Sequence, residues 1–118
     1  MSVLSPDPVA LTVARVNVSV QPDGQISCDP EQLVVTGSDV HIAFVLEGAG
    51  WIFPATGAVV VQGSSSLQFP QPSKTVADRL VTLLDLNSMA GIFSYQVYVQ
   101  NAITGVMRHT DPTIRNDT

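Results

Sequence analysis

The feature that most constrains this chain is a set of short segments in which apolar and polar residues alternate. In Asp39–Glu47 every second position is apolar, as shown by Val40, Ile42, Phe44 and Leu46. Ile92–Gln100 repeats the same period of two. Successive side chains of a β-strand point to opposite faces, so this period predicts strands with one buried face. We therefore expect a protein built from β-strands.

Turn-forming residues divide the chain at regular intervals. Clusters rich in Gly, Pro, Asn or Ser separate the apolar segments, at Gln21–Gln25, Thr36–Ser38, Gly48–Gly50, Gly63–Ser66 and Asn101–Gly105. Many short strands joined by such turns are typical of sandwiches and barrels. We expect an all-β, Greek-key β-sandwich of about seven to nine strands. The 118 residues suit a single domain, 1–118, that can bury a core without disulfides or metals.

One segment, Lys74–Leu86, fits two kinds of structure. Its apolar residues match helical spacing through Val76, Leu80, Leu83 and Leu84. A second set, Leu80, Thr82, Leu84 and Leu86, matches the period of a strand. The β-rich surroundings favour a strand, and a short helix near 75–84 stays open as the alternative.

The composition predicts self-association. Hydrophobic residues make up 45% of the chain and charged residues only 13%, about half of the roughly 25% typical of globular domains. Few charges are then left to solubilise the surface, so we expect a homo-oligomer. Two segments, Leu67–Phe69 and Val59–Val61, are candidates for edge strands that pair between copies.

Charge and hydropathy also exclude several partners. The net charge is −5, and the five Lys and Arg residues are scattered, so no basic stripe for nucleic acid or an anionic membrane is expected. No apolar run approaches the length of about 18 residues that a membrane helix needs. Met1–Pro8 has neither the basic nor the apolar region of a signal peptide, and Cys28 has no partner for a disulfide. A cytoplasmic location is the default, and a periplasmic or secreted one stays open.

Three aromatic residues are the candidate ligand-binding residues. Trp51 follows the glycine-rich Gly48–Gly50 and precedes Phe53, and Tyr98 lies in a predicted strand. A large amphipathic ring on a flexible segment can stack on a sugar or anchor a partner. The alternative is that Trp51 and Phe53 fold back into the core.

No catalytic, metal-binding or cofactor-binding residues are predicted. His41 and His109, with Glu47 or Asp111, lack the closely spaced ligand pairs of a structural zinc site. Nothing near Cys28 indicates a lowered pKa, so a buried thiol is expected. We predict a non-enzymatic interaction or structural module that self-associates. A ligand-binding module, with carbohydrate as one ligand, and a degenerate cupredoxin-like metal-binding domain are the alternatives.

Two segments resemble those of well-known β-sandwiches. Leu33–Ile42 and Gly91–Tyr95 are similar to strands of the cupredoxins, which implies a Greek-key sandwich. A blue-copper site needs a Cys after the second segment, and none is present there. The layout from Leu84 to Tyr95 also resembles immunoglobulin domains, in which a tyrosine corner and a disulfide are typical. Here Phe93 replaces the corner tyrosine and the cysteine pair is absent.

The chain also resembles the small bacterial DP-EP family. The residues that carry this resemblance are Asp29-Pro30, Gly91–Tyr95 and Asp111–Asn116, whereas no Glu-Pro dipeptide occurs. The family is functionally uncharacterised. The resemblance therefore implies a β-sandwich and no particular activity.

Overall fold

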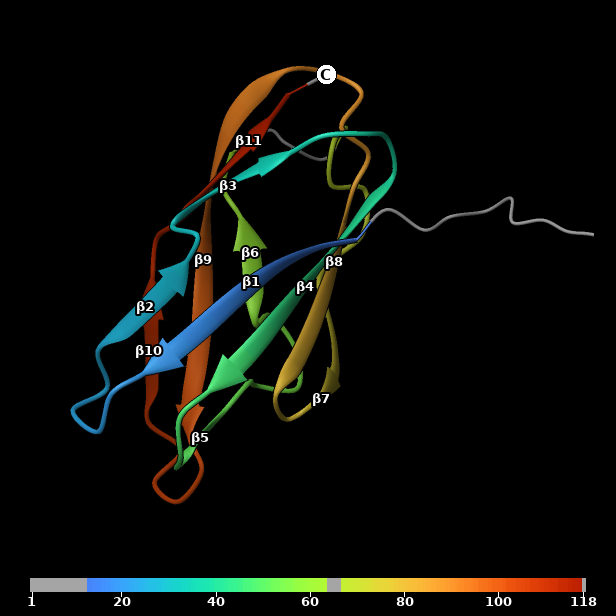
Figure 1. Ribbon diagram of the computed structural model, residues 1–118. Helices are drawn as coiled ribbons and strands as arrows, with labels where there is room; N and C mark the ends of the chain where they lie inside the picture. The colour runs from blue at the N-terminus through green and yellow to red at the C-terminus, as the bar shows by residue number, and fades with distance from the viewer. Residues whose placement is uncertain (1–12, 64–66, 118) are drawn as a thin grey trace, which may run out of the picture.

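The computed structural model describes residues 13–63 and 67–117 and shows two sheets packed face to face (Figure 1). These residues form eleven strands and no helix, which confirms the all-β prediction. The expected count of seven to nine strands was too low. The predicted loop Gly63–Ser66 falls partly on residues 64–66, which lie outside the described residues.

The first sheet has five strands. In spatial order they are β2 (Ile26–Asp29), β1 (Val13–Val20), β4 (Val40–Glu47), β8 (Leu80–Asp85) and β7 (Lys74–Ala77). Strands β1 and β4 run parallel, and the other neighbours are antiparallel. The alternation in β4 places Val40, Ile42, Phe44 and Leu46 inward, as their burial shows.

The second sheet is organised around its longest strand, β9 (Gly91–Asn101). One edge of β9 pairs with β5 (Trp51–Ile52) and β6 (Val59–Val61). The other edge pairs with β10 (Met107–Thr110) and then β11 (Thr113–Asn116). Beyond β11 lies β3 (Gln32–Val35), which is parallel to it. In Figure 1, β9 runs the length of the molecule between these shorter strands.

The chain crosses between the sheets at Asp29 and Pro30. Strand β2, in the first sheet, ends at Asp29, and β3, in the second sheet, begins at Gln32. Proline has no N–H to donate to a ladder, so it ends the pairing of β2 with β1. The dipeptide therefore separates β2 from β3.

The ambiguous segment forms a hairpin of β7 and β8, connected through Asp78 and Arg79. In β8, buried residues alternate with half-buried ones, so the strand alternative is confirmed and the helix near 75–84 is wrong. The two strands replace a single expected one, which accounts for part of the low count. Leu67–Phe69 is not a strand: this segment turns, and the Gln68 carbonyl accepts a hydrogen bond from Leu86 N at 2.8 Å.

The core fills the space between the sheets. Phe44 from the first sheet and Tyr95 from the second meet edge to face, with ring centroids 5.6 Å apart. Both side chains are fully buried. The Tyr95 hydroxyl has no hydrogen-bond partner among the described residues. Its ring therefore contributes packing, while its hydroxyl adds an unsatisfied polar atom.

Replacing Tyr95 by phenylalanine tests this division of roles. An unmade hydrogen bond of a buried group costs about 1–3 kcal/mol, so Tyr95→Phe should leave the stability unchanged or raise it. Phe44→Ala, which removes the partner ring, should cost about 3–5 kcal/mol. Urea unfolding monitored by circular dichroism measures both. A loss above about 1 kcal/mol for Tyr95→Phe would show that the hydroxyl is bonded.

Candidate functional site

Trp51 and Phe53 lie in the core rather than on an open surface. Their side chains are 6% and 2% exposed, respectively. A Cβ atom built on Gly24 would lie 3.4 Å from the Trp51 ring and 3.1 Å from Arg108 Nε. Gly24 and the Arg108 side chain thus lie close to the ring at the end of the sandwich. Neither aromatic ring presents a free face for stacking on a ligand.

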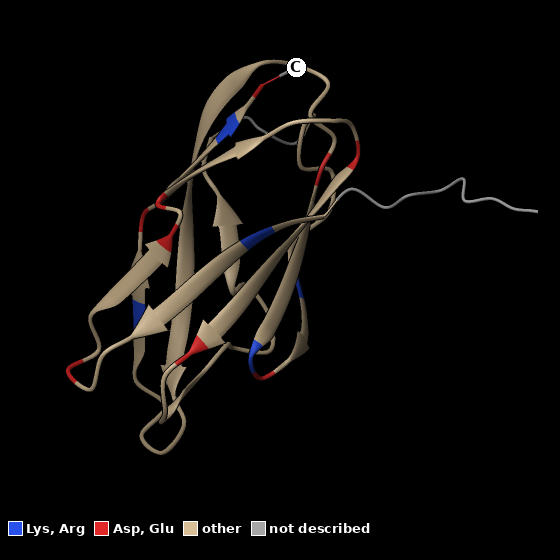
Figure 2. Cartoon of the chain, in the orientation of Figure 1, with Lys and Arg blue, Asp and Glu red and all other residues tan. Residues whose placement is uncertain are grey.

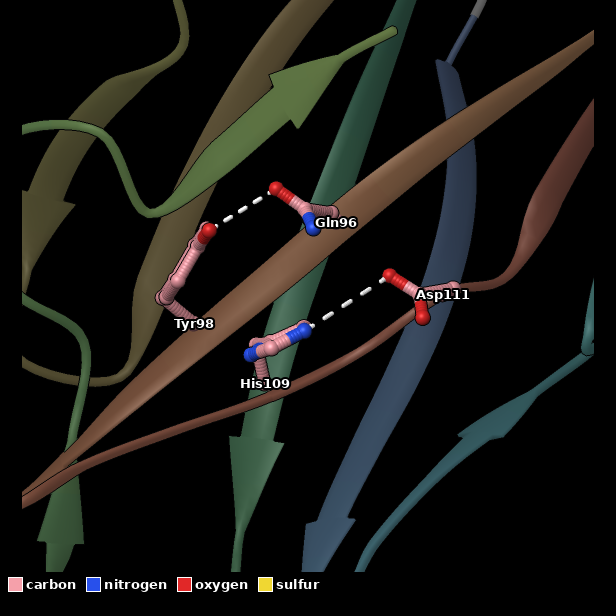
Figure 3. Close-up of polar contacts among 4 residues, drawn as sticks. All are labelled: Gln96, Tyr98, His109 and Asp111. Atoms are coloured by element: carbon pink, nitrogen blue, oxygen red, sulfur yellow. Dashed lines mark hydrogen bonds and ion pairs between the residues drawn. The ribbon is translucent and has the colours of Figure 1, made fainter.

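Tyr98 is the one predicted ligand-binding residue that reaches the surface. It lies half-buried on the outer face of β9, and its hydroxyl donates to Gln96 Oε1 at 2.8 Å (Figure 3). Its ring packs beside the His109 ring, with centroids 5.1 Å apart. His109 Nε2 lies 3.9 Å from Asp111 Oδ1. These contacts fix the Tyr98 ring in one orientation against the sheet.

The Tyr98 group belongs to a larger surface, the outer face of the second sheet. Strand register places Gln96 beside Val60, Tyr98 beside His109, and Gln100 beside Met107. We call this surface the amide face. Its members are the outward side chains of the sheet: Gln32, Val34, Ile52, Val60, Ile92, Ser94, Gln96, Tyr98, Gln100, Met107, His109, Thr113 and Arg115.

The two sheets differ in their charge. Each strand of the first sheet carries one Lys, Arg, Asp or Glu residue: Arg15, Asp29, Glu47, Lys74 and Asp85. The six strands of the second sheet carry only two, Arg108 and Arg115. Figure 2 shows the remaining described charges in the connections between strands and directly after β11. The amide face is therefore neutral apart from Arg115, with Asp111 at its margin.

The residues considered for metal binding do not come together. His41 lies on β4 of the first sheet and His109 on β10 of the second. Within residues 13–63 and 67–117, no group of three or more His, Cys, Asp and Glu side chains is arranged to hold a metal ion. Nothing in this part of the chain supports the metal-binding alternative.

Cys28 lines a cavity of about 240 Å³ between β2 and the Thr110–Pro112 segment. Burial, and to a lesser extent the nearby Glu31 carboxylate, raises the pKa of Cys28 to about 11. The thiolate is the nucleophilic form of cysteine. At neutral pH Cys28 is a thiol, and this state opposes a nucleophilic role.

A buried polar cluster at one end of the sandwich escaped prediction from the sequence. It consists of Gln68, Asp85, Asn87 and Asn116, each at most 4% exposed. Asp85 Oδ1 accepts hydrogen bonds from Asn87 N and from Asn116 Nδ2, both at 2.9 Å. Because Asp85 belongs to the first sheet and Asn116 to the second, this bond connects the sheets. In the sequence, the only indication of this cluster is Asp85, a carboxylate at a position of β8 where the side chain points into the core.

The cluster contains more acceptors than donors. Asp85 Oδ2, Asn87 Oδ1 and Asn116 Oδ1 have no hydrogen-bond partner among the described residues. The side-chain amide of Asn87 cannot supply a donor, because its Nδ2 already donates to the carbonyls of Val35 and Gly37. Burial raises the pKa of Asp85, although its hydrogen bonds with Asn116 and Asn87 act in the opposite direction. A proton on Asp85 would provide the missing donor.

Asp85→Asn should stabilise the protein at neutral pH, because the amide keeps an acceptor and adds donors. The gain should be about 1 kcal/mol, the scale of one buried unsatisfied polar group. The raised pKa means that protonated Asp85 stabilises the fold at low pH, and that this contribution is lost as pH rises through the folded-state value. The advantage of the variant should therefore grow from pH 4 to pH 8.

Chemical unfolding at several pH values measures this difference. Asp78→Asn is the matched control, because it removes the same charge from an exposed turn residue. Its effect on stability should stay small and vary little with pH. An Asp85→Asn variant that is less stable than the wild type at pH 8 would contradict the inference that the cluster contains more hydrogen-bond acceptors than donors.

Comparison with known proteins adds no functional information. No protein-family model matches the chain, and no curated protein matches it. The described residues contain no helix long and apolar enough to cross a membrane. A function has to be inferred from the surfaces and contacts of the chain itself.

Proposed function

We propose that the protein is a non-enzymatic interaction module that self-associates through the amide face. The observation that carries this proposal is the charge depletion of the second sheet. Protein interfaces are depleted in Lys, Glu and Asp and enriched in Tyr, Met and Arg. The amide face has this composition, with Tyr98, Met107 and Arg115 and without Lys or Glu.

The same face supplies apolar area for contact. Val34, Val60, Ile92 and Met107 are 47%, 41%, 64% and 44% exposed. Large residues with this exposure on a β-sheet surface favour covering by a partner. The surrounding glutamines offer neutral hydrogen-bonding groups, and burying them in an interface costs less free energy than burying charged groups.

A second copy of the chain fits this surface electrostatically. The whole chain carries a net charge of −5, so most orientations of two copies bring acidic groups together. The amide face reduces this repulsion, because none of its described side chains is acidic, and Asp111 and Asp117 lie only at its margins. In a two-fold contact the same patch serves both subunits. Arg115 of each copy can then approach Asp111 of the other.

Ile92→Lys should weaken the self-association at least tenfold, because it places a charge on the proposed contact surface. Val76→Lys is the matched control, since Val76 is a comparably exposed strand residue, on β7 of the first sheet. Sedimentation velocity at micromolar concentrations measures both variants against the wild type. A wild type that is monomeric throughout, or two variants that dissociate equally, would contradict the proposal.

A second candidate function is carbohydrate binding by the same face. Tyr98 favours it, because its ring is held between His109 and the Gln96 side chain and stays partly exposed. Aromatic rings beside neutral hydrogen-bonding groups suit the alternating apolar and hydroxyl surfaces of sugars. Titration with cellohexaose, xylohexaose and chitohexaose should shift the Tyr98 and His109 amide resonances. Unchanged spectra at millimolar sugar would exclude binding of these glycans.

A further inference from the structure

A groove runs along the outer edge of β6, where the two sheets separate. It encloses about 310 Å³ between β6 and the segment 69–73. Its lining is mainly apolar, with contributions from Val59, Val61, Phe69, Pro70, Pro72 and Leu83. None of the residues that line it is charged. The groove lies at the edge of the second sheet and adjoins the amide face at Val60, which belongs to both surfaces.

Within residues 13–63 and 67–117, no strand pairs with this edge of β6. Tyr98 N donates to the Ala58 carbonyl at 2.7 Å, and Gln62 N donates to the Ser94 carbonyl at 2.8 Å. In an antiparallel pair, residues that bond the partner strand alternate with residues whose backbone groups point away from it. Val59 and Val61 therefore direct their N–H and C=O groups away from β9, into the groove.

One of these four groups has a hydrogen-bond partner within residues 13–63 and 67–117. Val59 N donates to Ser73 Oγ at 3.2 Å. The Val59 carbonyl and both backbone groups of Val61 have no hydrogen-bond partner among the described residues. Such a row of one donor and two acceptors is the pattern that a further antiparallel or parallel strand would complete.

The opposite wall determines what kind of occupant fits. Pro70 and Pro72 have no N–H, so this wall provides few backbone donors and mainly apolar contact. Because the groove has a wall on each side, a single extended chain fits it better than the edge strand of a folded sheet. The uncharged lining favours a segment without charged side chains.

We propose that this groove binds an extended, uncharged segment of another polypeptide, which adds to β6 as a strand. Main-chain hydrogen bonds to Val59 and Val61 supply part of the affinity, and apolar side chains at every second position enter the groove between Phe69 and Leu83. This function goes beyond self-association, because it uses a different surface and a different kind of partner.

Val61→Pro is the protein variant that tests strand addition most directly. Val61 N points away from β9, so Val61→Pro removes the outward donor and leaves the bonds between β6 and β9 in place. Proline is tolerated on edge strands where the N–H faces outward. Val61→Thr is the matched control, because threonine keeps both the branched shape and the N–H group.

The probe is a capped hexapeptide that alternates threonine and valine, titrated into ¹⁵N-labelled protein up to millimolar concentration. Binding should shift the amide resonances of Val59, Val61 and Ser73. Val61→Pro should weaken it at least tenfold and Val61→Thr by less than threefold. Absence of shifts at these residues, or equal binding by the two variants, would overturn the proposal.

Two further experiments test strand addition in other ways. The first does not depend on the folding of Val61→Pro, and the second does not depend on self-association. A hexapeptide N-methylated at the amides that face β6 should lose binding to the unchanged protein, whereas methylation of the alternate amides should not. The Ile92→Lys protein should bind the unmethylated peptide like the wild type. Equal binding of both methylated peptides would refute strand addition, whatever the oligomeric state.

Discussion

The fold depends on one constraint, which is that β9 must pair its backbone along both edges over eleven residues. No single neighbour is long enough, so β5 and β6 share one edge and β10 and β11 share the other. Buried backbone groups have to be paired in this way, because an unpaired one costs about as much as a lost hydrogen bond. Because each edge of β9 is shared by two short strands, the second sheet has features that depend on where these short strands begin and end. One of them is β6, a three-residue strand whose outer edge lies open beside an apolar groove.

The alternation within β9 produces two very different surfaces from one segment. Tyr95, Val97 and Val99 are fully buried and pack into the core. Gln96, Tyr98 and Gln100 lie on the opposite side, where they form the centre of the amide face. Since β9 contains no charged residue, its outer side differs from the solvated face that antiparallel sheets commonly show. The first sheet, in which every strand except β8 carries a charged residue outside the core, has that ordinary character.

The sequence was sufficient to predict that the protein is built from β-strands and which strand residues point inward. These features follow from the alternation with a period of two, which depends only on residues close together in the chain. The sequence did not reveal that Lys74–Leu86 divides at Asp78 and Arg79, since neither residue is a strong turn signal. The pairing of Asp85 with Asn116 was also hidden, because it depends on contacts between residues distant in the chain. Trp51 illustrates a further limit. The glycines before it left both exposure and burial open, and the structure shows the ring buried, with Gly24 and Arg108 close to it.

The pairing of β3 has a consequence for the order of folding. Among the strands that the structure describes, β3 pairs only with β11. Gln32 and Thr113, which lie opposite each other, are 81 residues apart in the chain. During synthesis, β3 must wait until Thr113–Asn116 have been made before it can join the second sheet. Contacts between such distant residues slow folding, because the loop must close before the pairing stabilises it. The second sheet therefore acquires β3 only after β11 has been synthesised.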